Sequence, residues 1–221
     1  VTITENESEP TVTLTTSATS IAENAGSSLT LTATLSGATD QNVTVVLGTS
    51  GTATEGTDYT DGSGAVDDIT ITAGSTTGTV SFTPTDDSIY EGNETATIAI
   101  SSVTGEASES GTQAVTITIT ENESAPTVTL TTSATSIAEN SGSSLTLTAT
   151  LSGATNADVT VALSTSGAAT EGTDYTDGSG NIDDIVISAG STTGTVSFTP
   201  SDDSVYEDDE AATIAISSVS G

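Results

Sequence analysis

The run Val115-Thr116-Ile117-Thr118-Ile119 alternates apolar and hydroxyl-bearing residues. A period of two places the apolar side chains on one face of an extended strand and the hydroxyls on the other, as in a strand half-buried against a core. The same alternation returns at 12–15, 29–32, 43–45, 69–72, 80–82 and 98–100. Because Gly, Ser, Asn and Asp separate these runs and no segment has a helical period, they predict a seven-stranded, immunoglobulin-like sandwich.

This set of strands occurs twice, because residues 1–105 recur as residues 117–221 with 86 of the 105 aligned positions identical. The repeat length is that of a whole domain rather than of a solenoid unit. The sequence therefore predicts an all-β chain of two tandem Greek-key sandwiches, end to end. The expected domains are 8–123 and 124–221, and the linker 121–126 is too short to allow free swivelling.

The chain begins and ends out of phase with this repeat. Residues 1–7 read as the last strand of a preceding unit, because VTITENE returns as ITITENE at 117–123. The second unit lacks that strand within the chain, which leaves an edge of unpaired backbone groups. Two hypotheses follow: residues 1–7 complete a neighbouring copy by strand donation, or the chain is a window on a longer array that supplies the strand covalently. The similarity of the copies favours the array.

The charge balance is extreme, with 31 acidic residues and no Lys, Arg or His, for a formal net charge of −31. No side chain could neutralise phosphate, so nucleic acid is excluded as a partner and anionic membranes are disfavoured. Carboxylates that converge must therefore be solvated, protonated or neutralised by an external cation. The absence of Cys excludes disulfides and thiol catalysis, and no apolar stretch is long enough for a transmembrane helix.

The acids gather in loops beside strand ends, in register in both copies. Loops of a sandwich cluster at its two poles, so groups that are distant in sequence can converge. The most specific combination is Gly56-Thr57-Asp58-Tyr59 followed by DDSIYEGNE at 86–94, with its second copy at 172–175 and 202–210. In this combination the chain resembles the Calx-β domain across essentially all of both units.

Calx-β domains are seven-stranded sandwiches whose loops at one pole bind calcium; they include regulatory domains of sodium–calcium exchangers and repeats of large bacterial surface proteins. The ligands that the resemblance implies in the first copy, with Ile89 acting through its carbonyl, are Glu23, Asp58, Asp86, Asp87, Ile89, Glu91 and Glu94. Glu121 and Glu123 stand where the family usually has an Asp run. The second-copy equivalents are Glu139, Asp174, Asp202, Asp203, Val205, Glu207 and Glu210, and the second Glu-Asn-Glu would lie beyond Gly221.

Calcium is also the cofactor that the residues themselves favour. It accepts about 6–8 oxygen ligands, including carboxylates and carbonyls, whereas magnesium demands tighter octahedral geometry. Two carboxylates about 4 Å apart repel by about 1 kcal/mol even in water, so several at one pole are costly without a cation. The alternative is a merely solvated acidic surface, and we prefer that interpretation for Glu55, Glu171, Asp67, Asp68, Asp183 and Asp184.

We expect a structural role in an extracellular bacterial stalk, filament or adhesin, with calcium stiffening the junctions and neighbouring copies of the repeat as partners. A calcium sensor would need an attached effector, and near-identical copies suit a multiplied spacer better. An enzyme is disfavoured, because His, Cys and Lys are absent and the paired carboxylates lack aromatic sugar subsites. The Thr-x-Thr rows suggest ice binding, but β-branched residues on outward strand faces explain them more simply.

Overall fold

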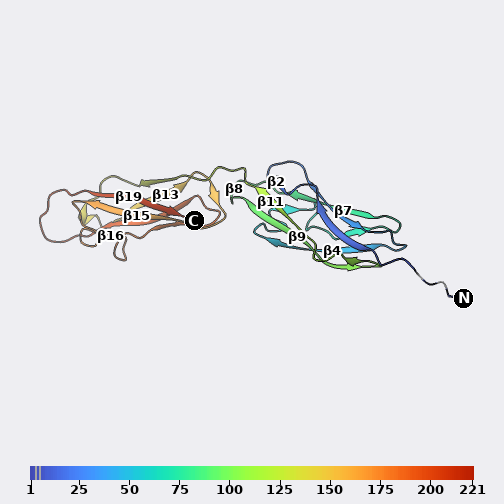
Figure 1. Ribbon diagram of the computed structural model, residues 1–221. Coiled ribbons are helices and arrows are strands. Elements are labelled where there is room, and N and C mark those ends of the chain that lie inside the picture. The colour runs from blue at the N-terminus through green and yellow to red at the C-terminus, as the bar shows by residue number, and fades with distance from the viewer. Residues whose placement is uncertain (3, 5) are drawn as a thin grey trace. The chain divides into compact units, whose positions relative to one another are not determined.

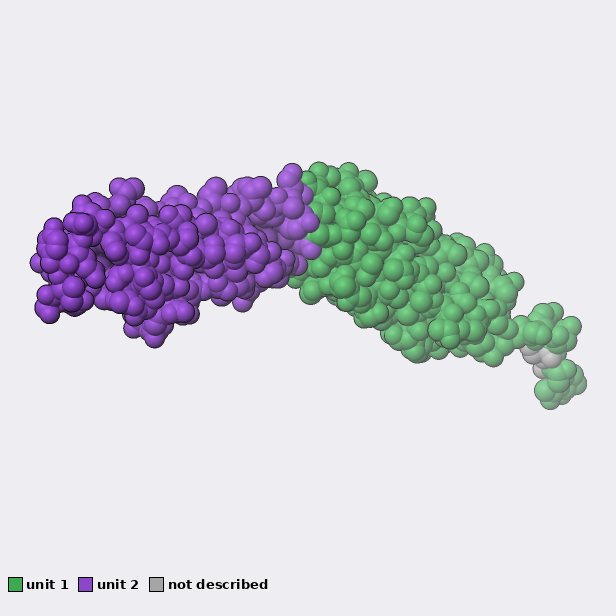
Figure 2. Space-filling view, turned by 60° about the vertical axis from the view of Figure 1, so that its left-hand side comes forward, with its two compact units in different colours: residues 1–87, 92–122 green, residues 88–91, 123–221 purple. Residues whose placement is uncertain are grey.

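The computed structural model describes residues 1–2, 4 and 6–221. The chain divides into two compact units, residues 1–87 with 92–122 and residues 88–91 with 123–221 (Figure 2). The strand expected at 1–7 includes Ile3 and Glu5, which lie outside the described residues. The described chain is built of strands and loops with one short 3-10 turn (Figure 1). It contains no helix that is long and apolar enough to cross a membrane.

All seven alternating runs of the first repeat are strands, as the sequence predicts. They are β1 (Thr11–Thr16), β3 (Leu29–Leu35), β4 (Val43–Gly51), β6 (Ile69–Ile71), β7 (Thr77–Pro84), β9 (Glu94–Thr104) and β11 (Ala114–Thr120). The shorter strands of this repeat are β2 (Ser20–Ala22), β5 (Tyr59–Thr60), β8 (Ile89–Tyr90) and β10 (Ser108–Glu109). Sequence reasoning missed the shorter strands because two or three residues are too few to show a period.

The first unit is a sandwich of two five-stranded sheets, with strand orders β10-β1-β3-β7-β5 and β2-β11-β9-β4-β6. Alternation decides which side chains enter the core between them: the leucines of β3 are buried, and the threonines between them face outward. Tyr59 and Phe82 stack in this core with ring centroids 4.7 Å apart. The remaining core is aliphatic, so the sheets come together mainly through Val, Ile, Leu and Ala.

A β-bulge gives Asp68 a hydrogen-bonding role that the sequence analysis did not predict. The pairing of β4 with β9 shifts register between Val46 and Leu47. The Leu47 N–H, displaced by the bulge, donates to Asp68 Oδ1 at 3.0 Å. The second repeat has the same bulge and the same bond, from the Leu163 N–H to Asp184 Oδ1 at 3.0 Å. These aspartates are exposed, as the sequence analysis expected, and each also accepts a backbone hydrogen bond at the bulge.

Glu55 is a structural acceptor as well. Its Oε2 accepts from the Thr49 hydroxyl at 3.0 Å, and its Oε1 accepts from the Val66 N–H at 2.6 Å. Glu171 makes the matching bonds in the second repeat, with the Thr165 hydroxyl and the Ile182 N–H. The carboxylate of each copy thus joins a sheet strand to the loop before β6 or its equivalent, which sequence position alone did not reveal.

The second unit repeats this architecture with one long strand fewer. Its strands are β12 (Val128–Thr132), β13 (Leu145–Leu151), β14 (Ala154–Thr155), β15 (Val159–Gly167), β16 (Tyr175–Thr176), β17 (Ile185–Ile187), β18 (Thr193–Pro200) and β19 (Ala212–Ser220). They form the sheets β12-β13-β18-β16 and β17-β15-β19, and β14 pairs in parallel with β8. Among the described strands, β19 pairs with β15 alone, whereas its counterpart β9 lies between β4 and β11.

This difference changes the surroundings of identical residues. In the first unit β2 pairs in parallel with β11, with Ile21 opposite Ile119. The equivalent segment 136–138 forms no strand in the second unit, and a 3-10 turn, η1 (Glu139–Ser141), follows it. Some side chains that are buried in the first unit are only half-buried in the second, for example Ile98 against Ile214.

The bulge predicts that the Oδ1 atom of Asp68, as a hydrogen-bond acceptor, contributes more to the free energy of unfolding than the charge of its carboxylate does. Asp68→Ala removes the acceptor of the Leu47 N–H and should lower the free energy of unfolding by about 1 kcal/mol. Asp68→Asn removes the same charge but keeps Oδ1, so it should lose much less. Urea unfolding of the two variants checks this expectation, and equal losses would contradict the role of the hydrogen bond.

Candidate metal centre

The acidic loops of the first repeat lie where its strands end. Glu23 follows β2 directly, and Glu121 follows β11. Because β2 and β11 run parallel, with Ala22 opposite Thr120, they deliver these two glutamates to the same end of the sheet. The Glu23 N–H donates to the Thr120 carbonyl at 3.0 Å, which continues the pairing up to the first acid.

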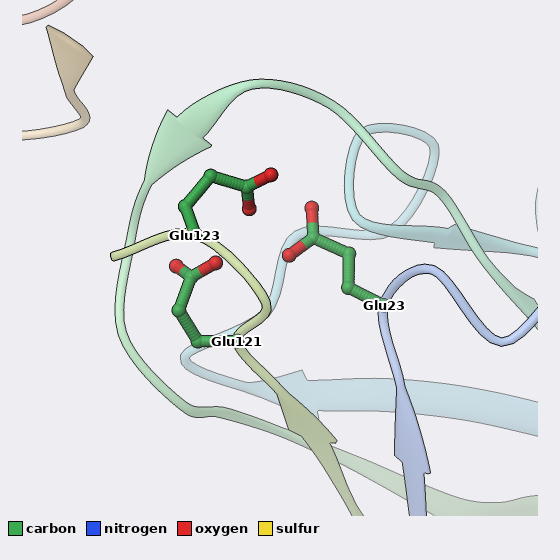
Figure 3. Close-up of side chains that lie close together, drawn as sticks. All are labelled: Glu23, Glu121 and Glu123. Carbon is green, nitrogen blue, oxygen red and sulfur yellow. The ribbon is translucent and has the colours of Figure 1, made fainter. Parts of the chain in front are cut away.

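Glu23, Glu121 and Glu123 form the first carboxylate group. Each contributes an oxygen, and these oxygens lie within 4.8 Å of one another. Figure 3 shows the three carboxylates turned toward a common space. Glu23 is only 6% exposed, and the Oε2 atom of Glu123 is buried. Burial strengthens the repulsion between like charges, so this arrangement favours a bound cation or a proton.

The loop 86–94 contacts this first group through its backbone. The Asp87 N–H donates to Glu23 Oε1 at 3.3 Å, and the Gly92 N–H donates to Glu121 Oε2 at 2.8 Å. The Glu121 N–H in turn donates to Asn93 Oδ1 at 3.0 Å. These bonds orient the glutamates, so the loop that carries the family motif helps to form a group to which its own acids do not belong.

Asp58, Glu91 and Glu94 form the second carboxylate group, again with one oxygen each within 4.8 Å of the others, and all three are half-buried. Asp58 lies in a tight turn, where its Oδ2 accepts the Thr54 N–H at 2.5 Å. Gly56 has a φ of 85° in this turn, a conformation that side chains other than glycine rarely adopt. The Gly-Thr-Asp-Tyr motif is therefore a turn that presents Asp58 immediately before β5.

The structure brings together six of the acids predicted for the first copy and leaves the others outside both groups. Asp86 and Asp87 are exposed, and Asp87 reaches the first group through its N–H. Ile89, predicted to act through its carbonyl, lies half-buried in β8. The predicted set is thus divided between two neighbouring groups, a division that residue spacing could not show.

The second repeat reproduces only the second group. Asp174, Glu207 and Glu210 have oxygens within 4.8 Å of one another, but both glutamates are exposed. Asp174 occupies the same turn as Asp58, and its Oδ2 accepts the Thr170 N–H at 2.6 Å.

The remaining predicted residues of the second copy lie on the surface. Glu139 is exposed in η1 and accepts the Asp203 N–H at 3.0 Å, as Glu23 accepts that of Asp87. Asp203 accepts the Val205 N–H at 2.6 Å, and Asp202, Asp203 and Val205 are exposed. Among the described residues Glu139 has no counterparts of Glu121 and Glu123 beside it.

The carboxylates around Glu207 in the second unit repel one another electrostatically. Desolvation, followed by the charges of Asp174, Asp203, Glu210 and Glu139, raises the pKa of the Glu207 carboxyl above its ordinary value. A nearby cation would favour the charged carboxylate and so lower this pKa. The like charges around Glu207 therefore favour either a proton on its carboxyl or a nearby cation, as in the first repeat.

Each repeat also has a pair of interacting aspartates that belongs to none of the carboxylate groups: Asp61 with Asp67, and Asp177 with Asp183. The N–H and hydroxyl of Ser63 lower the pKa of Asp61, while the charge of Asp61 raises the pKa of Asp67. Asp177 and Asp183 show the same opposed directions. The bond from the Ser63 N–H to Asp61 Oδ1 is 2.6 Å and closes a turn. These aspartates shape a loop, which explains why they match no predicted ligand.

Both repeats match a known domain family. The family model described as the Calx-beta domain matches residues 5–123 and again residues 121–221. No curated protein matches the chain.

The chain resembles several solved structures, three of which are the following. CBD12 from CALX1.2 is 18% identical over 85% of this chain and 74% of that chain, with a TM-score of 0.41. The calcium binding domain CBD12 of CALX1.1 is 21% identical over 80% and 70%, with a TM-score of 0.41. The apo-form Calx CBD1 domain is 17% identical over 52% and 99%, also with a TM-score of 0.41.

The raised pKa of Glu207 predicts the direction of the pH dependence without divalent cations. A carboxyl whose pKa is higher in the folded chain binds its proton more tightly there, so stability falls as pH rises from the unfolded through the folded pKa. We expect the unfolding midpoint of metal-free protein to fall as the pH rises above about 4.3, the ordinary pKa of a glutamate, and Glu207→Gln to reduce this fall. Thermal melts at constant ionic strength measure it.

Asp40→Asn is the matched control, because Asp40 is an exposed acid outside both carboxylate groups. It removes one charge from the chain without touching the cluster around Glu207. If the two variants reduce the fall equally, general charge repulsion rather than this cluster is responsible.

Proposed function

The chain belongs to the Calx-beta domain family in both of its repeats, and on that premise we propose that it is a calcium-binding structural module of an extracellular bacterial stalk, filament or adhesin. The observation that carries the proposal is the pair of three-carboxylate groups in the first repeat. Because the chain has no Lys, Arg or His, no side chain can neutralise them. A divalent cation is the simplest source of the missing positive charge.

The donor set fits calcium better than magnesium. Calcium–oxygen distances of about 2.3–2.6 Å place oxygens on opposite sides of the ion about 5 Å apart, against about 4 Å around magnesium. Oxygens within 4.8 Å of one another can therefore share a calcium ion with little movement. Glu23, Glu121 and Glu123 would hold one ion, and Asp58, Glu91 and Glu94 a second, with water completing each shell.

A bound ion would add links between segments that are far apart in sequence. In the first group it would tie the end of β2 to the residues after β11; in the second it would tie the turn at Asp58 to the loop before β9. Only seven residues separate β11 from β12, and Glu121 and Glu123 are among them. Calcium at Glu121 and Glu123 would thus immobilise the first part of the connection to the next repeat.

The near-identity of the repeats supports a spacer rather than a sensor. With 86 of 105 positions identical, the copies present one surface pattern twice, as expected of a multiplied structural unit. Extracellular modules of this kind bind calcium at about 10⁻⁴–10⁻³ M, so the ion would be held at extracellular concentrations. Calcium would then act as a component of the structure, lost when its concentration falls.

Isothermal titration of the whole chain with calcium tests the binding, and the repeat supplies a matched pair of variants. Glu23→Gln removes a buried member of a complete group and should weaken the tightest binding at least about tenfold, because affinity follows the number of charged ligands. Glu139→Gln makes the same change in the second copy and should leave that binding intact. The absence of calcium binding at millimolar concentration, or equal effects of the two variants, would contradict the assignment.

A distance measurement tests the stiffening of the connection. The chain has no Cys, so Thr77→Cys and Thr193→Cys, equivalent exposed positions of β7 and β18, allow a spin label in each unit. We expect a narrow distribution of label distances with calcium and a broader one with chelator. Glu121→Gln with Glu123→Gln should broaden it even with calcium, whereas Glu139→Gln should not. Identical distributions of label distances with and without calcium would contradict the proposal that calcium stiffens the connection.

A further inference from the structure

Glu55 belongs to neither carboxylate group of the first repeat. We propose that it is a positioning residue for the second group: its hydrogen bonds hold the turn of Asp58 where that carboxylate can bind a metal ion. The inference rests on the calcium binding proposed above. It assigns to Glu55 the orientation of a ligand rather than contact with the ion.

The second carboxylate group draws its members from both sheets of the first unit. Asp58 directly precedes β5, which pairs with β7, whereas Glu94 begins β9 in the other sheet. The Asp58 carbonyl accepts the Thr85 N–H at 2.9 Å, which fixes this side of the turn beside the end of β7. The distance between the Asp58 and Glu94 carboxylates therefore depends on how the turn is held against the sheet that contains β9.

Glu55 attaches the turn to that second sheet, because it is bonded to β4, the neighbour of β9. The side chain is half-buried, and its Oε2 accepts from the hydroxyl of Thr49 in β4 at 3.0 Å. Its Oε1 accepts from the Val66 N–H, in the loop before β6, at 2.6 Å. Both carboxylate oxygens thus have donors within the protein, which suits an anchor better than a metal ligand.

The turn transmits this attachment to Asp58 because its own hydrogen bonds close it. The Asp58 N–H donates to the Thr54 carbonyl at 2.9 Å, and the Thr54 N–H donates to Asp58 Oδ2 at 2.5 Å. On either side of these residues, the Gly56 N–H donates to the carbonyl of Tyr59 at 2.8 Å, and Tyr59 is only 1% exposed. Glu55 and Asp58 are therefore parts of one rigid turn, and holding the first holds the second.

The second repeat has the same bonds. Glu171 Oε2 accepts from the Thr165 hydroxyl at 2.9 Å, and its Oε1 accepts from the Ile182 N–H at 2.5 Å. The Thr170 N–H donates to Asp174 Oδ2 at 2.6 Å. The other two carboxylates of this group are exposed, whereas those of the first repeat are half-buried. The turn therefore keeps its hydrogen bonds around groups of different exposure, as expected of a scaffold formed before an ion binds.

A ligand held in place before the ion arrives raises the affinity, because binding then orders fewer groups. Outer residues that orient a metal ligand typically contribute about 10–100-fold to metal affinity. If Glu55 acts through geometry, an amide should replace its carboxylate. The oxygen of a glutamine could accept from the Val66 N–H while its nitrogen donates to the Thr49 hydroxyl.

A calcium titration of the whole chain, followed amide by amide in heteronuclear NMR spectra, tests the proposal. The Asp58 amide reports the second group and the Glu23 amide reports the first, so one titration measures both. Glu55→Ala should weaken the binding reported by Asp58 about tenfold or more and affect that reported by Glu23 far less. Glu55→Gln should restore the affinity of the original chain at Asp58.

Two variants are matched controls. Asp68→Ala also removes a carboxylate that accepts a backbone N–H, but its bond is to the bulge of β4 and not to the turn. It should lower stability and leave the calcium binding reported by Asp58 intact. Glu171→Ala makes the alanine change in the other repeat and should also leave that binding intact.

Two further measurements do not depend on how well Glu55→Ala folds or binds. Thr49→Val removes one donor and keeps the Val66 N–H bond, so it should weaken calcium binding at Asp58 less than Glu55→Ala does. In metal-free protein, the amide hydrogens of Thr54 and Asp58 should exchange faster in Glu55→Ala than in Glu55→Gln, because the turn has lost its attachment to β4.

The outcomes separate this proposal from the proposed function. Unchanged binding at Asp58 in Glu55→Ala, equal weakening by the alanine and glutamine variants, or equal weakening by Asp68→Ala overturns the positioning role while calcium binding stands. If the Asp58 amide of the original chain does not respond to calcium, the proposed function fails at this group. Amide exchange in the turn then decides the role of Glu55, and equal rates in the two variants overturn it.

Discussion

The place of one strand, β11, decides most of what distinguishes the two units. Its isoleucines enter the core, its edges pair with β9 and β2, and the residues that follow it supply two of the three carboxylates in the most buried acidic group. Core packing, strand pairing and the position of the carboxylates therefore all depend on where β11 lies. Nearly identical sequences therefore differ in local structure: the first unit has β11 beside β9, whereas no strand of the described residues lies on that side of β19.

The lack of any basic side chain gives these acids their significance. In most proteins a buried glutamate finds an arginine or a lysine, but here the available partners are N–H groups, hydroxyls, protons and external cations. Asp68 and Glu55 use N–H and hydroxyl donors and become parts of the scaffold. The groups at the strand ends each bring three carboxylates together, an arrangement that favours a cation or a proton.

The long strands could be predicted from the sequence, whereas the short strand β2 and the grouping of the acids could not. Alternation of apolar and hydroxyl residues was enough for the seven long strands, because period-two patterns depend on local geometry. It missed β2, although β2 positions Glu23, because three residues carry no period. Six of the acids predicted in the first copy lie close together in the structure, whereas Asp86 and Asp87 stay outside. Their division into two groups, and the hydrogen bonds of Asp68 and Glu55, depend on loops that meet only after folding.

The sequence by itself determined the fold class, the repeat and the lack of any basic side chain to pair with the acids, since strand alternation, self-similarity and composition are all properties of the linear chain. Tertiary structure alone decided which acids meet. Glu23 and Glu139 occupy the same place in the repeat, yet one is buried and the other exposed. The reason is physical: burial and charge convergence arise from the neighbouring strand, and in the described part of the chain β11 lies beside Glu23 whereas no strand lies at the same place beside Glu139.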